Sequence, residues 1–319
     1  WYTFEVFIVL FFCVNFISSI SLLIYLIVKK EFFIQKKYNT VSRKLKKMMF
    51  SYGLYVYVNN FGRNFILLAD TAMLASLRGL DEVGVYVVMV FFSNALFVPY
   101  VSLIRISSPL VPKFWKERKL NEMDKLYKKV SVLGFFFTFL LFSIVWLNFD
   151  FLLSFLPDFY ASGKYVFLFL MIGRLCDAIG GVNGDILLTS KKYKLEVIVT
   201  IPLLIITFLL NYLFIPQYGG VGAALASSIV YFLYNAVRLL INYFSFKLHP
   251  FNLNFFVVIV VGIIMFNLGL VLPQLNSLIL NICFNTLIPI LFFAMPILYF
   301  KLIPDLNDLV NQAYKTFRS

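Results

Sequence analysis

Charged side chains inside apolar stretches are the residues of this chain that could do chemistry. Arg63, Asn64 and Asp70 lie within residues 61–86, a stretch long enough to cross a bilayer. An ionised side chain at the centre of a bilayer costs about 3 kcal/mol or more, so a chain keeps one only where protein or water receives it. Arg63 and Asp70 are seven residues apart, about two helical turns, and project from nearly the same helix face. This spacing predicts a polar cavity.

A second apolar stretch, residues 164–188, carries Arg174 and Asp177 one helical turn apart. Glycines and polar residues, among them Asn183, follow directly and are typical of a broken helix, whose free backbone groups bind substrates or ions in transporters. Two other interpretations stay open. Arg174 and Asp177 could form an internal ion pair with a purely structural role, and the glycines have the GxxxG spacing of closely packed membrane helices.

No enzyme signature accompanies these charges. His249 is the single histidine and has no neighbouring Cys, Asp or Glu that would complete a metal or catalytic site. The sequence contains no phosphate-binding P-loop, no GxSxG and no HExxH motif. We therefore expect a protein that is not an enzyme and has no cofactor. A membrane bundle with a few buried charges is typical of a secondary transporter or a channel.

The composition sets the class of protein. Hydrophobic residues make up 61% of the 319 residues, charged residues 13%, and the mean hydropathy is +0.89, which predicts an all-α polytopic membrane protein. The net charge of +13 could suggest nucleic acid as a partner, but the basic residues lie in short connections between apolar stretches. Membrane topology alone requires that placement, so we expect no nucleic acid. The three cysteines lie in apolar runs and predict no disulfide.

Nine apolar windows of about 20 residues can be placed along the chain. Of the 28 Lys and Arg residues, 24, including Arg238, fall in alternate connections, and two fall in the opposite ones. The positive-inside rule makes the basic connections cytoplasmic, with the first residue outside and Ser319 inside. The windows are residues 4–28, 50–76, 83–105, 130–149, 164–188, 195–215, 220–246, 252–272 and 277–300.

The basic connection over residues 107–129 has apolar residues at helical spacing. They predict a helix lying in the plane of the lipid headgroups, with a solvated linker as the alternative.

Residues 67–86, LLADTAMLASLRGLDEVGVY, resemble the signature of the polysaccharide-lipid flippases, such as O-antigen flippases, in the multidrug, oligosaccharidyl-lipid and polysaccharide exporter superfamily. Two later stretches, GGVNGDILLTSKKYK and PQYGGVGAALA, are similar to later blocks of the same family. The residues that match the signature are Asp70, Gly79, Glu82, Gly84 and Tyr86.

The resemblance implies a fold of about fourteen helices in two six-helix lobes plus two additional helices. The nine windows then correspond to helices six to fourteen, and because the chain begins with Trp1 we expect a piece of a longer protein. The implied parts are a last helix of the N-terminal lobe (1–29), a basic cytoplasmic linker (30–49), a six-helix C-terminal lobe (50–246), two additional helices (250–303) and a cytoplasmic tail (304–319).

The same resemblance implies a function. Such proteins move an oligosaccharide on a polyprenyl diphosphate from the cytoplasmic to the outer leaflet of the bacterial cytoplasmic (inner) membrane. They do so by alternating access, for surface polysaccharides such as lipopolysaccharide. The implied partners are the lipid-linked oligosaccharide, membrane lipids, a polysaccharide polymerase and other assembly proteins.

The candidate site follows from that cargo. Guanidinium groups bind phosphate through paired hydrogen bonds, so the two arginines are the candidates for the diphosphate. The two aspartates would hold the arginines or carry a coupling ion, H+ or Na+, and asparagines would contact sugar hydroxyls. A drug or cation antiporter of the same superfamily and a non-transporting subunit of a polysaccharide assembly complex remain alternatives. The candidate substrate-binding residues are Arg63, Asn64, Asp70, Arg174, Asp177 and Asn183.

Overall fold

The computed structural model describes residues 4–29, 42–271, 278–304 and 306–308. The described residues form helices and connections without a strand, which confirms the predicted all-α class. The chain divides into two compact units, residues 1–53 and 54–319. The first unit contains α1 (Phe4–Val28) and the start of α2 (Arg43–Arg78). Most of the predicted basic linker and of the predicted tail lies outside the described residues.

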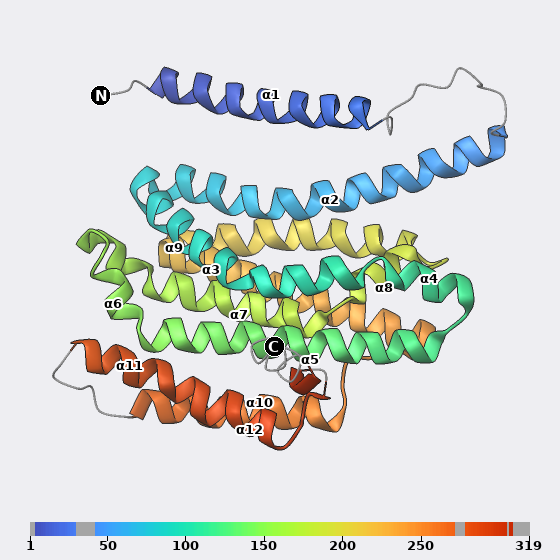
Figure 1. The fold of residues 1–319 in the computed structure, drawn as a ribbon. Helices are drawn as coiled ribbons and strands as arrows, with labels where there is room; N and C mark the ends of the chain where they lie inside the picture. The colour runs from blue at the N-terminus through green and yellow to red at the C-terminus, as the bar shows by residue number, and fades with distance from the viewer. Residues whose placement is uncertain (1–3, 30–41, 272–277, 305, 309–319) are drawn as a thin grey trace. The chain divides into compact units, whose positions relative to one another are not determined.

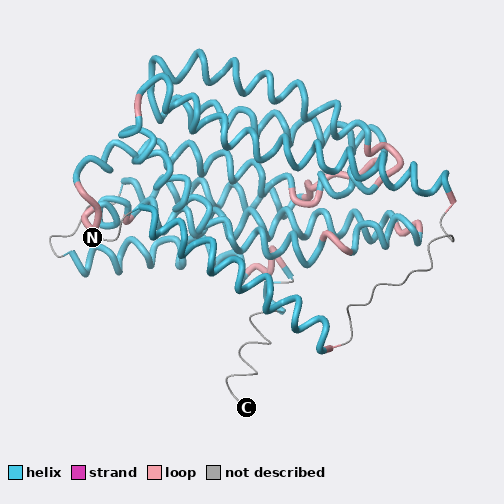
Figure 2. Tube along the Cα trace, turned by 90° about the horizontal axis from the view of Figure 1, so that it is seen from above, coloured by secondary structure: helices cyan, strands magenta, loops and turns pink. Residues whose placement is uncertain are grey.

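The second unit is a bundle whose long helices run side by side and are roughly aligned, as two perpendicular views show (Figure 1, Figure 2). It begins with the remainder of α2. The elements that follow are α3 (Leu80–Ser107), α4 (Leu110–Glu117), α5 (Leu120–Leu147), α6 (Phe149–Leu153), the 3-10 helix η1 (Asp158–Gly163), α7 (Lys164–Gly180), α8 (Asn183–Thr189), α9 (Lys194–Phe246), α10 (Leu253–Val271), α11 (Leu278–Pro289), the π-helical turn η2 (Ile290–Ala294) and α12 (Met295–Tyr299).

In the described residues, each predicted apolar window lies mostly on helix. Within the described residues, seven segments are long and apolar enough to cross a membrane. One of them is α9, whose 53 residues are divided by a kink at Gly219 into two arms, each the length of a span. The 36-residue helix α2, which carries Arg63, Asn64 and Asp70 in its second half, is not among the seven. The chain is a multi-pass membrane protein.

The bundle has two distinct ends. At one end, which we call the Gly79 end, lie the turn between α2 and α3, the short elements α6 and η1, and the kink of α9 (Figure 1). At the other, the α4 end, α4 packs against α8, and the Trp115 indole N–H donates to the carbonyl oxygen of Ile186 at 3.3 Å. The two ends are therefore built by different elements.

The helix predicted for residues 107–129 is present as two helices, and its location in the headgroup plane stays a prediction. The segment forms α4 and the first turns of α5. Its apolar residues Val111, Met123 and Tyr127 are fully buried against Val182 and Ile186. Protein therefore covers the apolar face of this segment.

The kink of α9 depends on Glu82, one of the signature residues. Gly219 has φ 56° and ψ −133°, a backbone conformation that glycine adopts readily and other residues avoid. The Gly220 N–H, at the start of the second arm, donates to Glu82 Oε2 at 3.1 Å. The Arg78 Nε lies 3.8 Å from Glu82 Oε1 and donates to the carbonyl oxygen of Ile215 at 3.3 Å. Glu82 thus caps the second arm of α9.

This contact makes a stability prediction. Glu82→Ala removes the acceptor of an N-terminal helix amide, which we expect to lower the thermal unfolding midpoint in detergent by about 2–5 °C. Glu82→Gln keeps an oxygen acceptor and gives up only a half-exposed ion pair, so its midpoint should lie closer to that of the wild type. Equal losses in both variants would assign the effect to the charge instead of the cap.

Candidate functional site

A polar cavity of about 420 Å³ lies among α3, α7, α8 and α9. Aromatic residues of α3, Phe97 and Tyr100, form part of its wall. Its charged and amide lining residues are Asn94, Arg105, Arg174, Asp177, Asn183, Asp185 and Arg238. The structure therefore gathers three of the predicted site residues, Arg174, Asp177 and Asn183, around one space.

Arg174 is held by neutral groups. Its Nη2 donates to Asn94 Oδ1, and its guanidinium lies over the rings of Phe97 and Tyr231 with centroid distances of 5.0 and 5.4 Å. Within the described residues neither Arg174 nor Asp177 forms an ion pair, so the internal pair considered above is not present. The positive charge of Arg174 therefore has no carboxylate bound to it in this part of the chain.

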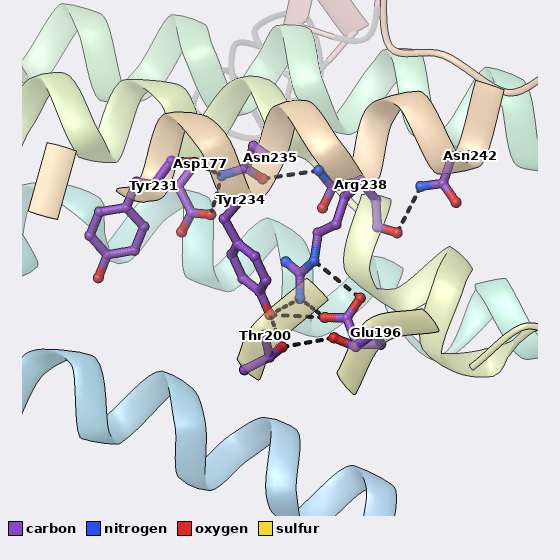
Figure 3. Close-up of polar contacts among 9 residues, drawn as sticks. Asp177, Glu196, Thr200, Tyr231, Tyr234, Asn235, Arg238 and Asn242 are labelled. Atoms are coloured by element: carbon purple, nitrogen blue, oxygen red, sulfur yellow. Dashed lines mark hydrogen bonds and ion pairs between the residues drawn. The ribbon is translucent and has the colours of Figure 1, made fainter. Parts of the chain in front are cut away.

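Asp177 and Asn183 belong to an amide network along the second arm of α9. Figure 3 shows Asp177 with Asn235 and Asn242 of that arm. Asn235 Nδ2 donates to Asp177 Oδ1 at 3.1 Å, and Asn183 Nδ2 donates to Asn235 Oδ1 at 2.9 Å. Asn242 Nδ2 donates to the carbonyl oxygen of Asn183 at 2.9 Å. These bonds fix the cavity wall where α7, α8 and α9 meet.

The helix break predicted within residues 164–188 is present. Gly181, with φ 52° and ψ −131°, separates α7 from α8, and Tyr100 Oη donates to the carbonyl oxygens of Asp177 and Gly181 at 3.0 and 3.1 Å. The glycines also allow close packing, because a Cβ on Gly180 would lie 2.1 Å from Asn235 Oδ1. The helix break and the close packing are therefore both present, and binding of a substrate or ion by the broken helix stays a prediction.

Asp70 does not join this cavity. Its carboxylate is fully buried and accepts hydrogen bonds from Tyr86 Oη at 3.0 Å, from Asn211 Nδ2 at 2.7 Å and from the Ser227 hydroxyl. These three donors come from α3 and from the two arms of α9, so four helical segments meet at one side chain. We call this group the Asp70 joint. Its geometry gives Asp70 no contact with a cargo in the cavity.

Arg63 and Asn64 lie within α2, but their side chains are outside the described part of the chain. The place of Arg63 on the face of Asp70 and the binding role of both residues stay predictions.

Two charged residues of the site escaped the sequence analysis. Arg238, counted there among the connections, is instead 5% exposed inside α9 and lines the cavity. Its partner Glu196 is fully buried. A signal was present in the sequence: Tyr231, Asn235 and Arg238 recur at the three- and four-residue spacing of one helix face. A polar stripe along an apolar helix indicates a face turned toward protein or water.

A bundle of membrane helices with a polar cavity beside a broken helix is typical of secondary transporters. Residues 56–213 match the family model MatE, so the chain carries a MatE domain of the multidrug, oligosaccharidyl-lipid and polysaccharide exporter superfamily. Members of the MatE family are transporters. This match confirms the family resemblance of the sequence.

One curated relative comes from Staphylococcus aureus, the capsular polysaccharide biosynthesis protein CapF. It is 26% identical over 178 residues, which are 55% of this chain and 43% of that protein. The match thus spans less than half the length of the relative. No solved structure gives a significant match.

Proposed function

We propose that this chain belongs to a flippase that moves a polyprenyl-diphosphate-linked oligosaccharide from the cytoplasmic to the outer leaflet by alternating access. The observation that carries the proposal is the polar cavity, in which Arg174 has amide and aromatic partners and no bound carboxylate among the described residues. A guanidinium held in this way can offer paired hydrogen bonds to phosphate oxygens. The name of CapF, a protein of capsular polysaccharide biosynthesis, supports a polysaccharide cargo.

The amides of the cavity suit the sugar part of such a cargo. Asn94 and Asn183 each have donor and acceptor groups, as sugar hydroxyls require, and both line the same space as Arg174. Asp177 can accept a hydroxyl hydrogen bond through its second oxygen. One cavity thus combines a cation for phosphate with neutral and anionic acceptors for hydroxyls.

Charge distribution supports an orientation. The α4 end carries clustered exposed cations. The positive-inside rule assigns this end of the bundle, and the C-terminus, to the cytoplasmic side of the bacterial inner membrane. The cavity, whose wall includes α8 from this end, then lies toward the leaflet where the cargo is made. Polysaccharide polymerase and other assembly proteins are the proposed partners. The exposed cations are Lys113, Lys116, Arg118, Lys119, Lys191, Lys192 and Lys194.

For Asp70 we propose a coupling role in place of cargo binding. Its carboxylate is enclosed by neutral donors from three helical segments, so a proton or sodium ion arriving there would change contacts that hold the Asp70 joint together. A coupling ion must bias the arrangement of helices to drive transport, and this position meets that condition.

Complementation tests the function. The protein is expressed in a bacterial strain that lacks its own flippase, and surface polysaccharide is stained; we expect restoration. Asp177 and Asp185 in the cavity favour a cation antiporter as the second candidate. Drug resistance in a sensitive strain without restored polysaccharide would support the antiporter. If surface polysaccharide returned only when a second, active flippase was expressed together with this protein, the result would support a non-transporting subunit.

A further inference from the structure

A buried cluster between the two arms of α9 is not explained by the proposed function. Arg238 Nε donates to Glu196 Oε2 at 3.2 Å, and its Nη2 donates to Glu196 Oε1 and to Tyr234 Oη (Figure 3). Tyr234 Oη also donates to Glu196 Oε1 at 2.9 Å and lies 3.3 Å from the hydroxyl of Thr200. The two charged side chains are 6% and 0% exposed. The cluster fixes one edge of the Arg238 guanidinium.

The Arg238 guanidinium also packs against Tyr234 and Gly184. Its Cζ lies 3.7 Å from the centroid of the Tyr234 ring. On Gly184, which lines the cavity, a Cβ would lie 2.9 Å from Cζ and Nη1 and 3.0 Å from Nη2 of Arg238. Nη1 is the guanidinium nitrogen that binds neither Glu196 nor Tyr234 among the described residues, and Arg238 itself lines the cavity. Glycine at position 184 permits that approach.

We propose that Arg238 is a second anion-binding residue of the polar cavity, and that Glu196 is the positioning residue that holds its guanidinium there. This inference rests on the proposed function and adds a residue to the same site. A guanidinium that is fixed along one edge and packed against Tyr234 and Gly184 loses little conformational freedom when an anion binds its remaining nitrogen.

The position of Arg238 complements that of Arg174. Asp177 of α7 and Asn235 of α9 lie at the same level, because they share a hydrogen bond. Both helices run from the Gly79 end toward the α4 end, so Arg174 lies one turn to one side of this level and Arg238 one turn to the other. Six residues of helical rise separate the two arginines by about 9 Å along the bundle. The cavity thus presents two guanidinium groups to an anion, at different positions along the bundle.

A purely structural role is the competing explanation for the pair. Burying two charges is expensive, and replacing a buried ion pair by neutral residues of similar size is often tolerated. A structural pair should therefore be replaceable without any change in anion binding, whereas the proposal requires a change.

The experiment measures binding of inorganic pyrophosphate to the chain in lipid nanodiscs by calorimetry. The double variant Glu196→Gln/Arg238→Gln removes both charges together and leaves no orphan charge. We expect it to bind pyrophosphate about tenfold more weakly, the loss of one charge-assisted contact. The matched control is Glu82→Gln/Arg78→Gln, which removes an ion pair at the Gly79 end and should keep wild-type affinity. Unchanged affinity in the Glu196/Arg238 double variant overturns the proposal.

The positioning role of Glu196 has its own comparison. Glu196→Ala and Glu196→Gln remove the same charge, but only Gln keeps an oxygen that can anchor Arg238. We expect the Gln variant to bind pyrophosphate at least threefold more tightly than the Ala variant, about the effect of one weak hydrogen bond. Equal affinities in folded samples, judged by size-exclusion elution, would refute positioning by Glu196.

Arg174→Gln in the same assay separates the two proposals. Weakened binding in Arg174→Gln with unchanged binding in the Glu196/Arg238 double variant refutes the inference and leaves the proposed function in place. Absence of pyrophosphate binding in the wild-type chain refutes the anion-binding cavity and, with it, the role of Arg238.

Discussion

Replacing Arg174 with Ala should reduce surface polysaccharide in the complementation strain by at least about tenfold, because the cavity loses paired charge-assisted hydrogen bonds to the diphosphate. Arg174→Lys should give an intermediate level, since an ammonium keeps the charge but lacks the planar fork that matches phosphate oxygens. The measurement is quantitative staining of surface polysaccharide at matched protein abundance in the membrane.

Lys164 offers the control for that experiment. It begins the same helix, α7, but lies at the Gly79 end and pairs with the exposed Asp150 at 2.6 Å. Lys164→Ala removes one positive charge from α7 without touching the cavity, so wild-type polysaccharide is expected. If Arg174→Ala also supported wild-type levels, the cationic cavity would play no part in transport.

Replacing Asp70 with Ala should cause the largest loss of stability in this chain. The substitution leaves donors of Tyr86, Asn211 and Ser227 without their acceptor in a fully buried site, which we expect to cost about 3 kcal/mol or more. We expect a strongly lowered unfolding midpoint in detergent and reduced abundance in the membrane. Thermal unfolding followed by tryptophan fluorescence checks the first of these effects.

Two further variants separate stability from coupling at this position. Ser227→Ala removes a single donor and should lower the midpoint by clearly less than Asp70→Ala. Asp70→Asn keeps a carbonyl acceptor and a similar shape but cannot take up a proton. If it folds and transport no longer responds to an imposed proton or sodium gradient, the coupling role is supported. A normal gradient response in Asp70→Asn would exclude it.

The sequence predicted the helices well because hydropathy and span length are local properties. It also predicted the helix break and the cluster of Arg174, Asp177 and Asn183, because those residues lie within one segment of the chain. Contacts between distant segments could not be predicted in the same way. The bond between Asp70 and Asn211 joins residues 141 positions apart, and an apolar window does not reveal which helix faces meet.

Arg238 is the clearest example of that limit. The charge count placed it in a basic connection although it falls within the apolar window 220–246, and the structure buries it inside α9 against Glu196. Glu196 falls within the window 195–215, and the sequence analysis gave it no role. The pairing of these two residues could not be predicted, because they lie 42 positions apart in the chain.

The two arms of α9 are linked by side-chain contacts at two levels. They share the Asp70 joint near the kink, and the pair of Glu196 and Arg238 links them near the other end. Fifteen residues, or about 22 Å, separate Asn211 from Glu196 on the first arm. Because the two arms are linked at both levels, we expect them to move as one body. A rocking motion must then bend the chain at another place. We expect such a motion to bend the chain at Gly181, where the helix is interrupted and the carbonyl oxygen accepts a hydrogen bond from the Tyr100 hydroxyl.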